Sequence, residues 1–122
     1  MNENKLNNFD IYLFNLEITE KSYYNTKINY RTAKYRIETE CTNNYDHYLL
    51  NLKDDCINLI KTYQTLSSEY VKLLNEYSSL NLIQKEILSN FQTFSVDVET
   101  LLDNSEKFLL KYTNEDNKKT TL

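Results

Sequence analysis

The sequence predicts an all-α protein, in which a long coiled-coil helix pairs with a shorter N-terminal helix as a helical hairpin or a bent rod. Two observations support this fold class. The 122 residues include no glycine and no proline, the residues that most often form turns and end helices. Apolar side chains also recur with a period of seven after residue 45, which is the repeat of a coiled coil. A chain of this kind has few connections, so one or two long helices are expected.

Composition also excludes several classes of protein. The net charge of −4 disfavours general nucleic-acid binding, which needs a basic surface. No apolar run is long enough to span a membrane, and the first residues, MNENKLNNFD, lack the apolar core of a signal peptide. The cysteines, Cys41 and Cys56, have no CxxC spacing, so we expect reduced thiols in a cytoplasmic protein.

Residues 1–44 form the first predicted region. Apolar residues recur with rough helical spacing at Leu6, Phe9, Leu13, Leu16, Tyr23, Tyr30 and Ile37. The segment FNLEIT alternates as a strand would, but a lone strand would have no partner, so helix is favoured. A break is expected at residues 41–46, where Asn43 and Asn44 tolerate turn conformations and Asn44 can cap the next helix. The first helix either folds back there or the chain bends and continues.

Residues 45–113 form the second region, the long coiled-coil helix. In a heptad that begins at Tyr45, the d positions are Tyr45, Leu52, Leu59, Leu66, Leu73, Leu80, Ile87, Phe94, Leu101 and Phe108. The a positions are Leu49, Cys56, Tyr63, Tyr70, Tyr77, Gln84, Phe91, Val98, Ser105 and Tyr112, and only Gln84 and Ser105 break the pattern. The seam continues for about nine heptads, which predicts a left-handed supercoil and a rod roughly 100 Å long. Residues 114–122 are a polar tail.

The width of this seam predicts partners. Apolar residues also occupy the e positions Ile60, Leu74, Leu88, Leu102 and Leu109, so the stripe suits a bundle of three or four helices. The first helix is too short to cover it, so we expect other helical coiled-coil subunits, in a hetero-oligomer rather than a homo-oligomer. The predicted partner-binding seam is Leu52, Leu59, Tyr63, Leu66, Tyr70, Leu73, Tyr77, Leu80, Ile87, Phe91, Phe94, Val98 and Leu101.

No catalytic, cofactor or metal site is expected. His47 falls at an f position without a visible nucleophile or second base. A metal site of Cys41, His47 and Cys56 would need a fourth ligand, and Cys56 lies on the seam, where cysteine packs as a small apolar residue. The tyrosine row of Tyr63, Tyr70 and Tyr77 is favoured as core packing over a stacking platform, because all three residues are at a.

Residues 21–36 are the one polarised segment, KSYYNTKINYRTAKYR, which contains basic residues and tyrosines but no acid. On a helix, Lys27, Arg31 and Lys34 share a face. This face either complements acidic helices, which we favour, or binds an anionic membrane or nucleic acid as an adaptor would.

Five segments together resemble a known family: TAKYRIE at 32–38, KDDCINLI at 53–60, TLSSEYVKL at 65–73, SLNLIQKEI at 79–87 and KFLLKY at 107–112. From Tyr23 to Tyr112 the chain is similar to the second subunit of the biogenesis of lysosome-related organelles complex. It departs from the family pattern at Thr26–Lys27, where a glycine–glutamate step is typical, and at VETLLDNS. The resemblance implies a non-catalytic subunit of a heteromeric rod that acts in endosomal sorting or lysosome positioning, in the cytoplasm and peripherally on endosomal or lysosomal membranes. Subunits of kinetochore, spindle or tethering complexes are the alternative.

Overall fold

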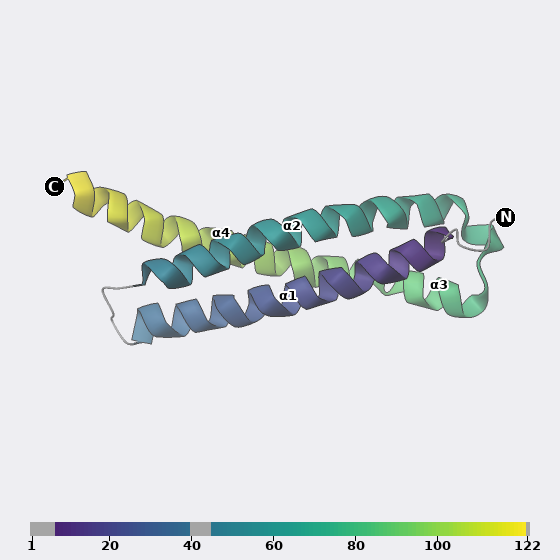
Figure 1. Ribbon diagram of the computed structural model, residues 1–122, viewed down its shortest axis with the longest axis horizontal. Helices are drawn as coiled ribbons and strands as arrows, with labels where there is room; N and C mark the ends of the chain where they lie inside the picture. The colour runs from purple at the N-terminus through teal and green to yellow at the C-terminus, as the bar shows by residue number, and fades with distance from the viewer. Residues whose placement is uncertain (1–6, 40–44, 122) are drawn as a thin grey trace.

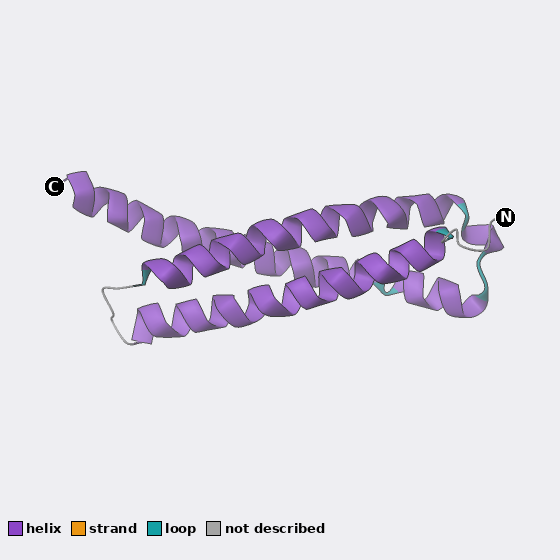
Figure 2. Cartoon of the chain, in the orientation of Figure 1, coloured by secondary structure: helices purple, strands orange, loops and turns teal. Residues whose placement is uncertain are grey.

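The computed structural model describes residues 7–39 and 45–121, with side chains described as far as residue 113. Its elements are α1 (Asn8–Thr39), α2 (Asp46–Asn75), the short 3-10 helix η1 (Tyr77–Ser79), α3 (Leu82–Ser89) and α4 (Phe91–Thr121). Helices α1 and α2 lie antiparallel, and α4 returns along both of them (Figure 1). The described residues contain no strand (Figure 2). The predicted all-α fold is therefore confirmed, and α1 does fold back on α2.

The structure differs from the prediction within residues 45–113, which do not form one uninterrupted helix. Helix α2 ends at Asn75, and the chain reverses direction before α3 begins at Leu82. A capping box starts α3, because Asn81 Oδ1 accepts from the Gln84 backbone N–H and Gln84 Oε1 accepts from the Asn81 backbone N–H, both at 2.9 Å. Gln84, the polar interruption of the a positions, thus serves as a helix cap instead of a seam residue. The antiparallel return shortens the predicted rod to a compact three-helix bundle.

Close packing joins α1 to α2. Thr19, Ser22, Thr26 and Ala33 lie on one face of α1 and are buried. The Thr19 hydroxyl lies 3.2 Å from the Thr62 carbonyl oxygen, and the Thr26 hydroxyl lies 3.2 Å from the Asp55 carbonyl oxygen. Hydroxyl groups on short side chains reach the opposite backbone only when two helices lie close together, so this pair is the tightest contact in the bundle.

Three apolar clusters form the core along the bundle axis, and each contains residues from at least two helices. Near the reversal the buried residues are Phe9, Tyr12, Leu66, Leu73, Leu88 and Phe91. Leu59, Val98 and Leu101 occupy the middle. At the other end the cluster contains Ala33, Ile37, Tyr45, Leu52, Cys56, Phe108 and Tyr112. The heptad seam is therefore the core of a single chain.

Leu66 is fully buried in this core, whereas Leu82 is 73% exposed. We expect Leu66→Ala to lower the free energy of unfolding by about 2–5 kcal/mol, since it removes buried methyl groups and leaves a cavity. Leu82→Ala, the matched control, should change it by roughly 0.5 kcal/mol or less. Urea unfolding followed by circular dichroism measures both, and equal effects would contradict the described core.

Tyr12 gives the fold a pH dependence. Its side chain is fully buried and its hydroxyl has no hydrogen-bond partner among the described residues. Burial, with smaller contributions from Tyr70 and Glu20, raises the pKa of Tyr12 from about 10 to about 12. Between these values the unfolded chain releases this proton and the folded chain retains it, so stability falls as pH rises from 10 to 12.

We therefore expect the free energy of unfolding to fall less between pH 10 and pH 12 in Tyr12→Phe than in the wild type. The difference should be on the order of 2 kcal/mol. Tyr24 is 58% exposed, and Tyr24→Phe is the matched control for the loss of a tyrosine hydroxyl. Urea unfolding at pH 10, 11 and 12 provides the comparison. Identical pH profiles for the wild type and Tyr12→Phe would contradict the burial of an ionisable hydroxyl.

Candidate partner-binding groove

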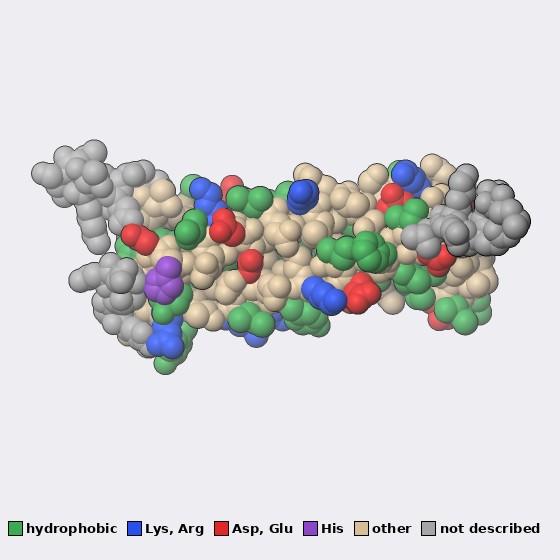
Figure 3. Space-filling model, viewed as in Figure 1, with side chains coloured by type: hydrophobic (Ala, Val, Ile, Leu, Met, Phe, Trp, Pro, Cys, Tyr) green, Lys and Arg blue, Asp and Glu red, His purple; other side chains and the backbone are tan. Residues whose placement is uncertain are grey.

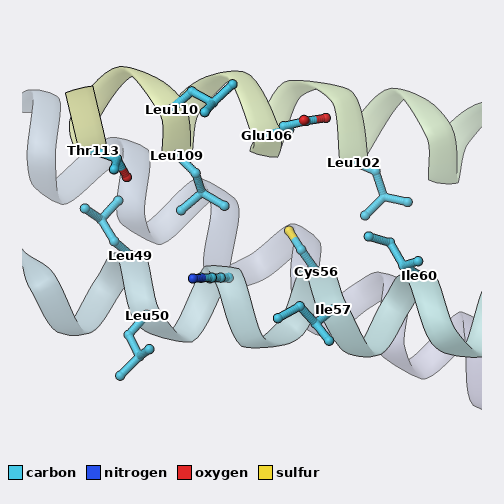
Figure 4. Close-up of a pocket in the computed structure, with 11 residues that line it drawn as sticks. Leu49, Leu50, Cys56, Ile57, Ile60, Leu102, Glu106, Leu109, Leu110 and Thr113 are labelled. Carbon is cyan, nitrogen blue, oxygen red and sulfur yellow. The ribbon is translucent and has the colours of Figure 1, made fainter. Parts of the chain in front are cut away.

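An apolar groove runs between α2 and α4, on the side of the bundle that α1 does not cover. From α2 it is lined by Leu49, Leu50, Lys53, Cys56, Ile57 and Ile60. From α4 it is lined by Leu102, Glu106, Leu109, Leu110 and Thr113. The groove encloses about 620 Å³. Figure 4 shows Leu102 and Leu109 directed toward α2, and Leu49 and Ile60 directed toward α4.

The groove exists because α2 has more apolar surface than its two neighbours cover. Residues at its g and c positions face α1, as the contacts of Asp55 and Asn58 with α1 show. The e and b positions lie on the other side, and there the chain carries the α2 stripe, defined as Leu50, Ile57, Ile60, Val71 and Leu74. Each of these side chains is between 42% and 58% exposed. Scattered apolar residues are ordinary on a surface, but a helical stripe beside a groove indicates an unpaired helix face.

Charged groups stand on both sides of the groove. Lys53 lines it from α2, and Glu106 lines it from α4. Both are exposed, and neither forms an ion pair with another described residue. The two sides of the groove therefore differ in charge, which would orient a charged helix placed between them.

Most residues of the predicted partner-binding seam lie in the interior of the chain. Leu52, Leu59, Leu66, Leu73, Phe91, Val98 and Leu101 are buried, and Tyr63, Tyr70, Leu80, Ile87 and Phe94 are partly buried against the same core. Tyr77 is 45% exposed at the reversal. The seam is occupied by the chain's own helices, because α4 packs where the sequence predicted a partner. The widened e side of the stripe, with Ile60, Leu102 and Leu109, is what borders the groove.

The tyrosine row is divided between the core and the turn. Tyr63 and Tyr70 stack on Phe91, with ring centroids 6.2 Å and 4.1 Å apart. The Tyr63 hydroxyl lies 3.2 Å from Glu99 Oε1. Tyr77 stays at the surface, with the Lys85 ammonium 4.8 Å from its ring centroid. The predicted core packing is therefore right for Tyr63 and Tyr70, which pack against α4, and wrong for Tyr77, which is 45% exposed.

The predicted anionic-partner face lies on α1, away from the groove. Lys27 is half-buried and Arg31 is exposed, and both line a hollow of about 250 Å³ between α1 and α4 that also contains Asp97. Arg31 and Lys34 line a second hollow together with Glu38. Each hollow thus contains a carboxylate of the chain itself, an arrangement that fits charge complementarity within the bundle.

The other candidate residues are separated in the structure. His47 is exposed at the start of α2, with its ring 3.8 Å from that of Tyr48. Cys56 is buried, which raises the pKa of its thiol, while Cys41 and the proposed cap Asn44 lie outside the described residues. No group of three or more His, Cys, Asp or Glu side chains among the described residues could hold a metal ion.

On the face formed by α1 and α2, hydrophobic side chains occur as separate patches between polar ones (Figure 3). In the part of the chain that the structure describes, no helix combines the length and the apolar character needed to cross a membrane.

The asparagine–glutamine cap is the feature that the sequence analysis missed. The signal was present as Asn81-x-x-Gln84, which has the spacing of a capping box. The interruption of the a positions at Gln84 coincides with it. Recognition of this pair would have predicted a helix start at residue 82.

Comparisons with known proteins give no relative. No protein-family model matches the chain, and no match was found among the curated proteins or the solved structures. The resemblance to the second subunit of the biogenesis of lysosome-related organelles complex therefore stays a prediction.

Proposed function

We propose that this chain is a non-catalytic helical subunit that binds a helix of another protein in the groove between α2 and α4. The observation that supports this function is the α2 stripe, whose side chains are about half exposed and of which Leu50, Ile57 and Ile60 line the groove. A fourth helix in the groove would complete a four-helix bundle.

The groove suits an amphipathic helix. An apolar face of such a helix, with anchors at i, i+3, i+4 and i+7, would cover Leu50, Ile57 and Ile60 on α2 and Leu110 on α4. Covering the exposed half of each of these side chains contributes about 1 kcal/mol. Charge complementarity favours an acidic residue of the partner beside Lys53 and a basic residue beside Glu106.

The charge pattern also favours a different protein over a second copy. Lys53 lies near the middle of the part of α2 that lines the groove, between Leu49 and Ile60. Two copies packed antiparallel through this face of α2 would bring their Lys53 side chains near each other at the two-fold axis, and like charges so placed disfavour association. We therefore propose a hetero-oligomer, with the partner supplied by another helical subunit.

The family resemblance suggests the assembly to which this subunit belongs. It supports a complex of the lysosome-related organelle biogenesis or lysosome-positioning machinery, placed in the cytoplasm and peripherally on endosomal or lysosomal membranes. The groove would then be the contact between this subunit and its neighbour in the rod.

We expect Ile57→Glu to weaken partner binding at least tenfold, since a carboxylate without a partner would be buried in the interface. The matched control is Ile28→Glu, because Ile28 is 60% exposed on α1 and Ile57 is 57% exposed on α2. Tagged wild type and both variants are purified from cells, and the bound proteins are compared by mass spectrometry. Proteins retained by Ile28→Glu and lost with Ile57→Glu are then tested as purified pairs.

Crosslinking of a purified pair locates the contact. Lys53 should crosslink to the partner helix, whereas Lys21 on α1 should not. Equal capture by the two glutamate variants, or crosslinks confined to Lys21, would contradict a partner site in the groove.

A further inference from the structure

The reversal between α2 and α3 preserves the heptad register. Leu73, Leu80 and Ile87 keep d spacing across it, and Tyr70 and Tyr77 keep a spacing. A loop that only connects two antiparallel helices has no need to preserve this phase. Because the heptad phase is preserved, one continuous helix through residues 76–81 would keep all its a and d residues on one face.

The segment 76–81 is able to form a helix. It contains no glycine and no proline, and only Leu80 and Asn81 have extended backbone, with ψ of 146° and 174°. Residues Tyr77–Ser79 already form a 3-10 turn. Asn90, between α3 and α4, is in the right-handed helical conformation. A change at Leu80 and Asn81, with a smaller one at Glu76 (φ −106°, ψ 14°), would therefore join α2, α3 and α4 into one helix.

Few contacts hold the reversal closed. Besides the Asn81–Gln84 capping box, backbone hydrogen bonds run from Ser79 to Glu76 and from Leu80 to Tyr77, and the Ser79 hydroxyl donates to the Glu76 carbonyl oxygen. Asn8 Nδ2 donates to Glu76 Oε1 at 2.8 Å, the Lys85 ammonium lies over the Tyr77 ring, and Leu80 is partly buried against the core. Tyr77 and Ile83 remain exposed at the turn, by 45% and 68%. The reversal therefore leaves apolar surface uncovered that a straight helix could bury.

We propose that two copies of the chain associate by exchanging their α3–α4 segments, with residues 76–81 helical in each copy. Helix α4 lies antiparallel to α2 within one chain (Figure 1). In each copy, α2, α3 and α4 would then form one continuous helix. If a two-fold axis near the hinge at residues 76–81 relates the copies, the α4 segment of one copy lies antiparallel to the α2 of the other. It then packs on the second copy's α1 and α2 with the same contacts.

The exchanged dimer gains contacts that the single chain lacks. The two hinges cross at the two-fold axis, where Tyr77 and Leu80, at a and d, would face their counterparts. Helical hydrogen bonds replace the turn. Exchange of an identical element is a low-cost route to a dimer because the core contacts already exist. The groove between α2 and α4 is retained, so this inference does not depend on the proposed partner.

Leu82 provides a selective test. It is the first residue of α3, follows the extended Asn81, and is 73% exposed. Proline is favoured at the first position of a helix and after an extended residue, so Leu82→Pro should leave the single-chain fold intact. In the straight helix the same proline would lie in the interior and break it.

Wild type, Leu82→Pro and Leu82→Ala are refolded at high protein concentration and analysed by size-exclusion chromatography with light scattering. We expect a dimer from the wild type and from Leu82→Ala, and a loss of at least roughly a hundredfold in dimer association for Leu82→Pro. Circular dichroism of the Leu82→Pro monomer checks that it is folded. Two glycines inserted after Ser79 should also abolish the dimer, because in the continuous helix they would shift the phase of the heptad seam. In the single chain the same insertion only lengthens the turn, so the monomer should still fold.

Ile57→Glu separates this dimer from one formed through the groove. The exchanged dimer should persist in Ile57→Glu, because the exchange keeps the α2–α4 packing of the single chain and the half-exposed Ile57 has the same surroundings in monomer and dimer. A wild type that stays monomeric at every concentration, a dimer unaffected by Leu82→Pro, or a dimer lost in Ile57→Glu would overturn the proposal.

Discussion

The reversal of the chain at residues 76–81 is the constraint on which the rest of the structure depends. It turns one long heptad seam into two antiparallel halves that bury each other, with α1 as the third member. A straight helix would leave the same seam exposed to a partner. In the exchange proposed above, the fold of one chain and the association of two copies would be alternative uses of the same apolar residues, and the conformation of a short turn would select between them.

The unequal packing of the bundle explains where the groove lies. Helix α1 approaches α2 closely, because Thr19 and Thr26 are short and their hydroxyls bond to carbonyl oxygens of α2. Between α2 and α4 the facing side chains are larger, as Leu49 and Leu109 illustrate. The two helices are less closely joined there, and their outer apolar side chains stay partly exposed. The space that α1 leaves uncovered is thus the space that suits a fourth helix.

The helices and most of the core were predictable, because heptad spacing is a local property of the sequence. The reversal was not, since the register passes through it unchanged and neither glycine nor proline marks it. Only the spacing of Asn81 and Gln84 pointed to a helix start. The fold-back of α1 on α2 was one of the two predicted arrangements, but the residues of the close contact were missed, because Thr19 and Thr26 are polar residues that become buried only when a second backbone accepts their hydrogen bonds. The widened e side of the seam did predict excess apolar surface, but its position beside α4 depends on the reversal.

A distance between α2 and α4 within one chain tests this account most directly. Spin labels at Lys53→Cys and Glu106→Cys, in a chain with Cys41→Ser and Cys56→Ala, can be measured by pulsed electron paramagnetic resonance. An excess of unlabelled chain and low protein concentration suppress distances between molecules. The three-helix bundle predicts a separation of roughly 10–25 Å, since both residues line one groove. A continuous helix would place them about 80 Å apart, and the absence of a short distance would contradict the reversal.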